Sequence, residues 1–225
     1  GGVPANSIAR WNGTAWSPFG QGMNGAVFAL TTLPNGDLVA GGQFSAADGT
    51  AANCVARWNG TAWTPLGSGM NNLVWALVTM PNGDVVAGGA FNTAGGATVP
   101  RIARWNGTSW SAMGTGMNSD VMALATLPNG DVVAAGSFTT AGGTPANRIA
   151  RWDGTAWSAL GSGMNGNVNA LTTLPNGDLV AAGPFTTAGG VPATRIARWN
   201  GTAWSALGSG LDDSVYELAT RPNGE

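Results

Sequence analysis

The chain has 225 residues, of which 37 are glycine and 11 are tryptophan, while only 9% are charged. It contains nine arginines, no lysine and no histidine, and its net charge is −2. This composition excludes the basic surface that nucleic-acid binding requires, and no apolar run approaches the ~20 residues of a membrane span. We therefore expect no nucleic-acid partner, no membrane span and an extracellular or cell-surface protein.

One motif, Arg-Trp-Asn/Asp-Gly, recurs every 47 residues along the chain. Its five copies begin at Arg10, Arg57, Arg104, Arg151 and Arg198. A period of 20–50 residues is typical of solenoids, arrays and propellers. The repeat therefore decides the architecture before any single residue does.

Four short apolar runs make up each repeat. In the copy 164–210 they lie at 168–174, 179–185, 195–199 and 202–208. Asn-Gly joins the first run to the second and the third to the fourth, which favours tight hairpin turns. Four antiparallel strands and no helix in a unit of this length predict the blade of a β-propeller. The fold class is all-β, and we expect a five-bladed propeller.

The blade boundaries follow from the period. A single propeller domain covers 1–225, with four full blades at 23–69, 70–116, 117–163 and 164–210. Residues 1–22 supply the third and fourth strands of a closing blade, and 211–225 supply its first strand. The second strand of that blade is missing after Glu225, so we expect self-association by strand addition at this slot, or a gap.

Each copy carries two tryptophans, five residues apart, on its outer hairpin. If Asn-Gly supplies the two central turn residues, both indoles lie on one face as diagonal neighbours. We interpret them as structural wedges between blades, the alternative being exposed pairs that stack on sugar rings. They are Trp11, Trp16, Trp58, Trp63, Trp105, Trp110, Trp152, Trp157, Trp199 and Trp204.

An acidic residue opens the second strand of each repeat, and an arginine closes the third strand at the same edge. The acids are Asp37, Asp84, Asp131, Asp178 and Glu225. This arrangement predicts structural ion pairs, such as Arg57 with Asp37, in which the loss of one partner is costly.

The two sets of loops differ in how much they vary between copies. The Asn-Gly turns are almost constant, whereas the loops at the other end of the strands diverge, and loops on a rigid scaffold commonly carry binding sites. One varied position near the start of the first strand holds Phe28, Trp75, Met122, Asn169 and Tyr216. With the loop residues Asn72, Asp120, Asn167 and Asp213, these are the candidate ligand-binding residues. Plugging of the channel and neutral drift are the alternatives.

Catalytic and metal-binding chemistry is poorly represented. Without histidine or lysine the usual general bases are missing, and the carboxylates form no evident inward pair for glycoside hydrolysis. Cys54 is the one cysteine, so neither an internal disulfide nor a cysteine zinc site is available. We expect no enzyme activity, no cofactor and no metal. The Asn-Gly-Thr sequons at Asn12, Asn59, Asn106 and Asn200 coincide with the hairpin turns, which explain them.

The string A-R-W-N-G-x-x-W-S-x-L-G-x-G-M/L-N, followed by P-N-G-D-L-V-A-G-G-x-F-T-T-A-G-G, is similar to the near-identical propeller repeats of bacterial surface or secreted proteins. It also resembles repeats of a fungal cortical polarity-marker family. The resemblance implies a propeller outside the cell and brings no catalytic residues, and the near-identity of the copies indicates recent amplification or an engineered chain. The expected function is a non-catalytic binding module, lectin-like or protein-binding. The alternative is a scaffold without a ligand of its own.

Overall fold

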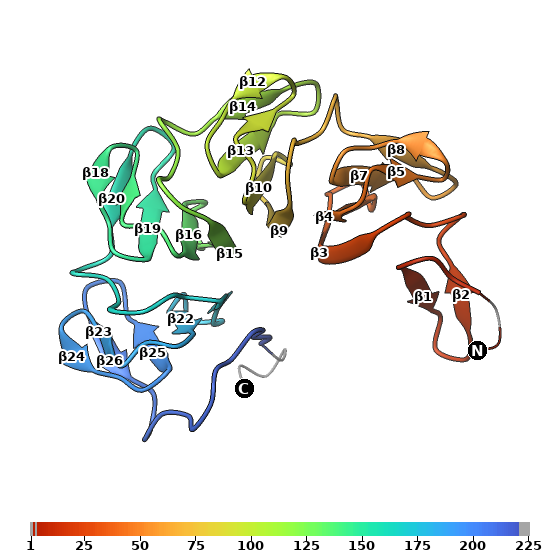
Figure 1. Ribbon diagram of the computed structural model, residues 1–225. Helices are drawn as coiled ribbons and strands as arrows, with labels where there is room; N and C mark the ends of the chain where they lie inside the picture. Colours follow the sequence, from red (N-terminus) through yellow and green to blue (C-terminus); the bar gives the residue numbers. More distant parts are fainter. Residues whose placement is uncertain (1, 3, 221–225) are drawn as a thin grey trace. The chain divides into compact units, whose positions relative to one another are not determined.

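The computed structural model describes Gly2 and residues 4–220, and every regular element in this part is a β-strand (Figure 1). The chain forms two compact units, Gly1–Ala112 and Met113–Glu225. Each unit contains two four-stranded antiparallel sheets whose strands follow one another in chain order. The predicted all-β fold of repeated four-stranded antiparallel sheets is confirmed.

The first unit holds the sheets β3-β4-β7-β8 and β9-β10-β13-β14. Their strands are β3 (Ala26–Thr32), β4 (Leu38–Gln43), β7 (Val55–Trp58), β8 (Trp63–Pro65), β9 (Val74–Thr79), β10 (Val85–Gly89), β13 (Ile102–Trp105) and β14 (Trp110–Ala112). An additional hairpin, β1 (Ala9–Trp11) and β2 (Trp16–Pro18), precedes them.

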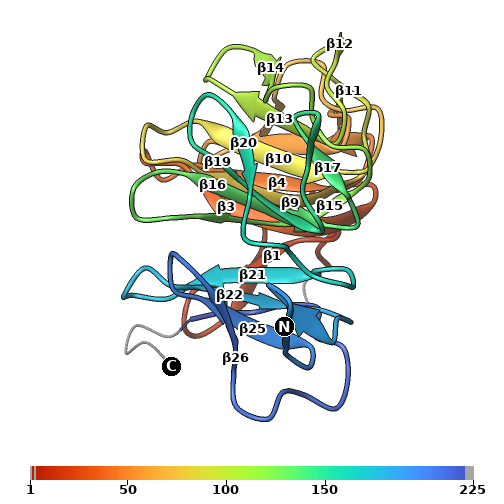
Figure 2. The same ribbon diagram turned by 90° about the vertical axis from the view of Figure 1, so that its left-hand side faces the viewer.

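The second unit holds β15-β16-β19-β20 and β21-β22-β25-β26, and Figure 2 shows the strands of the latter sheet. Its strands are β15 (Val121–Thr126), β16 (Val132–Gly136), β19 (Ile149–Trp152), β20 (Trp157–Ala159), β21 (Ala170–Thr173), β22 (Leu179–Ala182), β25 (Ile196–Trp199) and β26 (Trp204–Ala206).

The connection between the second and third strands of each sheet is more regular than the loop expected from its glycines and prolines. It contains a hairpin of two-residue strands in all four sheets. These are β5 (Ala46–Ala47) with β6 (Thr50–Ala51), β11 (Thr93–Ala94) with β12 (Ala97–Thr98), β17 (Thr140–Ala141) with β18 (Thr144–Pro145), and β23 (Thr187–Ala188) with β24 (Val191–Pro192).

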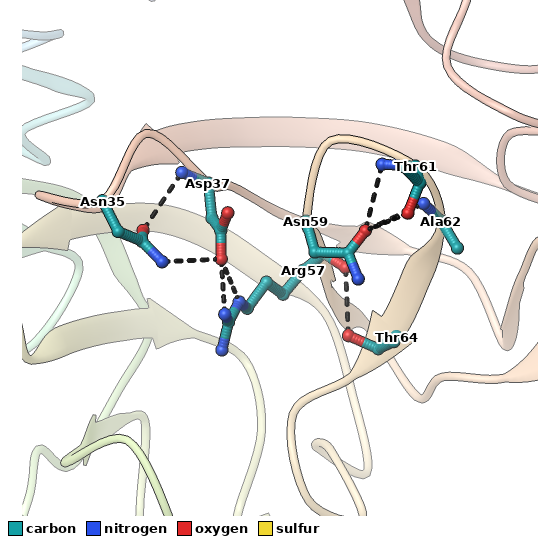
Figure 3. A network of polar contacts seen from close by, with 7 residues as sticks. All are labelled: Asn35, Asp37, Arg57, Asn59, Thr61, Ala62 and Thr64. Carbon is teal, nitrogen blue, oxygen red and sulfur yellow. Dashed lines mark hydrogen bonds and ion pairs between the residues drawn. The ribbon is translucent and has the colours of Figure 1, made fainter.

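The register of the outer hairpin differs from the prediction. Trp58 pairs directly with Trp63, so four residues close the turn instead of two, and the other copies share this register. The Asn59 Oδ1 atom accepts hydrogen bonds from the Thr61 N–H, the Thr61 hydroxyl and the Ala62 N–H (Figure 3). Because the side chain satisfies these donors, the longer turn is favoured. The two indoles therefore lie opposite each other, with ring centroids 5.6 Å apart.

The second tryptophan of the pair is buried against the preceding repeat. Trp110 is 7% exposed, and its Nε1–H donates to the main-chain oxygen of Leu66 at 2.9 Å. The same bond, to the oxygen 44 residues earlier, is made by Trp63, Trp157 and Trp204. A first tryptophan packs against each of these indoles, namely Trp58, Trp105, Trp152 and Trp199.

The N-terminal copy of the tryptophan pair is different. Trp11 and Trp16 contact each other, with centroids 5.5 Å apart, but remain 50% and 51% exposed. The neighbouring Arg10 guanidinium lies 5.6 Å from the centroid of the Phe19 ring. In the first unit, this hairpin therefore presents an aromatic pair to solvent.

Ion pairs connect the second and third strands of each sheet. Arg57 places Nε and Nη2 each 2.5 Å from Asp37 Oδ2, which also accepts the Asn35 amide (Figure 3). The carboxylate side chain is 11% exposed and the arginine 40%. Equivalent pairs are Arg104 with Asp84, Arg151 with Asp131, and Arg198 with Asp178. The predicted acid Glu225 lies outside the described residues.

The core of each unit forms between its successive sheets. In the first unit, Val39 and Val55 of one sheet pack with Val74 and Leu77 of the next. In the second unit, Val133 and Ile149 pack with residues of the following sheet in the same manner. Within each unit, the faces that the two successive sheets turn toward each other are therefore covered by apolar side chains.

The segment 211–220 was expected to form the first strand of a closing blade. No strand is formed within these residues, and the remaining 221–225 lie outside the described part. Val215 and Leu218 nevertheless pack against Val180 and Ile196 of the preceding sheet. In the first unit, Val74 packs in the same way against Val39 and Val55. Five blades and a closed ring remain predictions.

Candidate binding site

The varied position near the start of the first strand coincides with a β-bulge. Val74 pairs with Gly89 and Ala76 with Gly88, which leaves Trp75 as the extra residue of β9. The same shift in register occurs around Phe28 in β3 and Met122 in β15. A bulge turns a side chain away from the regular alternation of the strand. It therefore sets the direction of the residue that differs most between the copies.

A glycine opposite each bulge makes room for it. A Cβ atom on Gly89 would lie 2.0 Å from the main-chain oxygen of Leu73, and one on Gly42 would lie 2.1 Å from that of Ala26. A Cβ atom added to Gly136 or Gly183 would lie 2.1 or 2.3 Å, respectively, from a main-chain oxygen. Gly42, Gly89 and Gly136 lie opposite a bulge, whereas Gly183 follows β22, whose pairing with β21 has no shift in register. The recurring glycine is the sequence signal that pattern analysis overlooked.

In the first unit, the bulge brings two aromatic side chains together. The rings of Phe28 and Trp75 stack with centroids 4.7 Å apart and an interplanar angle of 26°. Phe28 is 40% exposed and Trp75 is half-buried. Leu30, two residues along β3, is 50% exposed. The result is an apolar surface on neighbouring strands whose central pair is held in a fixed geometry.

In the second unit, the same position carries different chemistry. Met122 and Asn169 are half-buried, and Tyr216 is 77% exposed. The Asn169 amide donates to the main-chain oxygen of Val215 at 3.2 Å. Here the residue of one repeat contacts the main chain of the next, where the first unit has a ring stack.

Two of the four polar loop residues predicted to bind ligand accept a hydrogen bond from the next residue in the chain. Asn72 Oδ1 accepts the N–H of the next residue at 2.8 Å, and Asp213 Oδ1 accepts that of Ser214 at 2.6 Å. Both residues are exposed, whereas Asp120 and Asn167 are half-buried. Asn72 and Asp120 lie within three residues of the bulges at Trp75 and Met122.

A second set of asparagines, which sequence analysis did not identify, shapes the same loops. Asn71 Oδ1 accepts the N–H groups of Asn92 and Thr93 at 2.9 and 3.0 Å. The equivalent asparagines are Asn24, Asn118 and Asn165. The Met-Asn pair, which four of the five copies share, is the signal that indicates a structural role. The loops at this end of the sheets are therefore pinned, although their sequences vary.

Shallow hollows lie between these loops in the first unit. One of about 600 Å³ is lined by residues that include Asn6, Ser7, Gly22, Met23 and Asn24. Another, of about 480 Å³, is lined by the residues 47 positions later, including Asn53, Cys54, Gly69, Met70 and Asn71. A third, of about 350 Å³, adjoins it and includes Gln43, Phe44, Cys54, Asn72 and Leu73. The concave surface thus repeats with the sequence.

Reactive groups are few at these positions. Burial raises the pKa of the Cys54 thiol, and the hydrogen bond with the Phe44 main chain partly opposes this shift. Within the described residues, no three histidine, cysteine or acidic side chains form a group that could hold a metal ion. In the same part of the chain, no helix is long and apolar enough to cross a membrane.

Comparison with known proteins agrees on the fold. A β-propeller family described as a domain of unknown function, DUF5122, matches residues 81–107, 127–152 and 174–201. No curated protein matches the chain.

Three similar solved structures have low sequence identity. The extracellular domain of a protein described as a hybrid two component system, BT4673 from B. thetaiotaomicron, has a TM-score of 0.58 at 10% identity, covering 88% of this chain and 25% of that one. A protein described as a gluconolactonase gives 0.56 at 13% identity, with coverages of 87% and 67%. YCF48 bound to D1 peptide gives 0.50 at 19%, with coverages of 87% and 57%. The chain spans about a quarter of the length of the first structure.

Proposed function

We propose that this β-propeller repeat protein is a non-catalytic binding module that holds a segment of a partner protein at the varied ends of its sheets. The stack of the exposed Phe28 ring on the half-buried Trp75 ring, positioned by two β-bulges, is the observation that carries the proposal. Rigid aromatic side chains contribute large contact area at low entropic cost and often dominate binding energy.

The local structure supports an anchoring role for this pair. The sheets beneath it are fixed by buried valines and ion pairs, and the nearby loops are pinned by asparagine side chains. A ligand would therefore meet a preformed surface, and little binding energy would be lost in ordering the protein.

Two comparisons are compatible with this role. One similar structure is a propeller bound to a peptide, and another is an extracellular domain. We accordingly propose that binding takes place outside the cell.

Selection from a displayed peptide library on the intact chain would test the proposal. The double variant Phe28→Ala/Trp75→Ala should lose capture of the selected peptides while keeping most of its thermal stability. Trp11→Ala/Trp16→Ala is the matched control, because it removes another exposed aromatic pair. Equal capture by both double variants would contradict the proposal.

Sugar binding is the second candidate, because the rings of Phe28 and Trp75 also suit stacking against the apolar face of a sugar. A glycan array with the same two double variants distinguishes the ligand classes. Failure of both library and array would favour the remaining alternative, a scaffold without a ligand. The near-identity of the five repeats supports that alternative.

A further inference from the structure

One loop position adopts a left-handed backbone in every repeat although none of its residues is glycine. The residues are Ser7, Cys54, Arg101, Arg148 and Arg195, with φ between 62° and 68°. Such φ values are uncommon outside glycine, so the backbone at this position is strongly determined by its surroundings. The side chain that projects from it, in contrast, differs between copies.

Where this residue is arginine, its guanidinium binds main-chain oxygens of the neighbouring loops. Arg101 Nη1 donates to the oxygen of Ala90 at 2.5 Å. Arg148 Nη1 donates to the equivalent oxygen, that of Ser137, at 3.1 Å, and approaches Phe138 O at 3.4 Å. The two copies thus repeat the same contact in separate units.

The third arginine uses another acceptor. Arg195 Nη1 donates to the main-chain oxygen of Leu211 at 3.0 Å. Two main-chain oxygens near this position can therefore accept a guanidinium, one on each neighbouring loop.

The Cys54 side chain carries no guanidinium and is too short to contact either of the equivalent main-chain oxygens. The residues equivalent to Ala90 and Leu211 are Gln43 and Met70, and each lines one of the two hollows that meet at Cys54. The hollow beside Gln43 has a volume of about 350 Å³ and is also lined by Phe44, Asn72 and Leu73. The hollow therefore adjoins Gln43, the residue equivalent to those whose main-chain oxygens Arg101 and Arg148 contact in their own repeats.

We propose that the hollow between Gln43 and Cys54 binds the guanidinium of an arginine side chain supplied by a partner segment. The arginine would occupy the space that Arg101 and Arg148 fill in their own repeats, and donate to the main-chain oxygen of Gln43. Hydrogen bonds from a charged donor are stronger than neutral ones. The planar guanidinium also suits several acceptors at once, unlike the ammonium of lysine.

The hollow lies near the aromatic stack, so a single ligand could carry both an apolar side chain and an arginine. Gln43 pairs with Ala26, two residues before Phe28, and Leu73 lies two residues before Trp75. A segment with an apolar side chain on the stack would carry its arginine near the hollow. As a description of the partner the inference rests on the proposed function, but the arginine site has a test of its own.

N-acetyl-arginine amide is the probe, and N-acetyl-citrulline amide, of the same shape without the charge, is its control. Titration of the ¹⁵N-labelled full chain should shift the amide signals of Phe44, Cys54 and Leu73 saturably with arginine. Citrulline should bind at least roughly tenfold more weakly, because it lacks the charge-assisted donors.

Two variants of the hollow make the test specific. Cys54→Arg supplies the guanidinium internally, and it should remove the arginine-dependent shifts while the thermal midpoint is kept or raised. Cys54→Ser keeps the hollow open, as Ser7 does in its repeat, and should bind arginine as the unchanged chain does.

Equal affinity for citrulline, or unchanged binding by Cys54→Arg, would overturn the inference, as would the absence of a saturable shift. The Phe28→Ala/Trp75→Ala variant should still bind the arginine probe. If the probe fails while selected peptides still depend on Phe28 and Trp75, only the arginine site is wrong. If the probe binds while peptide capture does not depend on those rings, only the proposed function is wrong.

Discussion

The indole N–H of Trp110 donates to the main-chain oxygen of Leu66 at 2.9 Å, 44 residues earlier in the chain. This bond joins the outer hairpin of one repeat to that of the preceding repeat. The indole is buried and also contacts Trp105, with ring centroids 5.4 Å apart. The tryptophan pair therefore combines apolar burial with a directional bond at the contact between neighbouring repeats.

Trp110→Ala should lower the free energy of unfolding by roughly 3–5 kcal/mol, the range for truncation of a large buried side chain. Trp110→Phe should recover much of this loss but leave Leu66 without its donor, at about 1 kcal/mol. Chemical denaturation would provide both values. Trp16→Ala is the control for an exposed indole and should cost less than about 1 kcal/mol. Equal costs for Trp110 and Trp16 would contradict the packing argument.

The ion pair of Arg104 with Asp84 should be asymmetric. The carboxylate side chain is 11% exposed and that of the arginine is 35% exposed. Arg104→Gln leaves a buried charge without its partner, whereas Asp84→Asn leaves a cation that solvent can reach. We expect the first substitution to destabilise by about 1–3 kcal/mol and the second by less. Urea unfolding of the two variants measures the difference, and the reverse order would contradict this interpretation.

The bulge at Trp75 depends on Gly89. An added Cβ would lie 2.0 Å from the Leu73 main-chain oxygen. Gly89→Ala should therefore shift β9 and lower the free energy of unfolding by roughly 1–3 kcal/mol. Movement of the strand should also weaken the near-ultraviolet circular dichroism of the Phe28–Trp75 stack. An unchanged spectrum together with unchanged stability would show that the glycine does not maintain the bulge.

Asp153 replaces the asparagine found in the other outer turns. Its pKa is lowered to about 2, first by the Ala156 N–H, then by the Thr155 N–H and hydroxyl. The unfolded value is about 3.9, so ionised Asp153 stabilises the folded chain above that pH. The contribution is lost as pH falls through about 2.

A carboxyl ¹³C titration by NMR would measure this pKa directly. Asp153→Asn keeps the acceptor oxygen, as the asparagines at the same position in the other copies do. Between about pH 4 and 2, its thermal midpoint should therefore fall less than that of the unchanged chain. A titration midpoint near the unfolded value would show that the turn does not hold the carboxylate.

Much of the architecture is accessible from the sequence because the repeat makes each strand visible several times. The spacing of Asp37 and Arg57 predicts an acid beside an arginine, and the structure places Arg57 Nε 2.5 Å from Asp37 Oδ2. Strand positions and turns can be predicted because they depend on residues close together in the sequence, which short sequence patterns capture.

The register of the outer hairpin and the bulges were not predicted, for physical reasons. Asn-Gly alone favours a two-residue turn, but the Asn59 side chain accepts three hydrogen bonds and stabilises a longer one. The bulge at Trp75 depends on contact with a neighbouring strand, so alternation within β9 does not reveal it. The hollow at Cys54 likewise becomes visible only when arginine contacts in other repeats are known.

The central claim is that a ligand binds against Trp75, and ¹⁵N-indole NMR of the full chain with a library-selected peptide tests it most directly. Trp75→Phe assigns the Trp75 signal. The proposed function predicts that the peptide shifts this signal saturably and leaves those of the buried Trp63 and Trp110 unchanged. A peptide that binds without moving the Trp75 signal would contradict the claim.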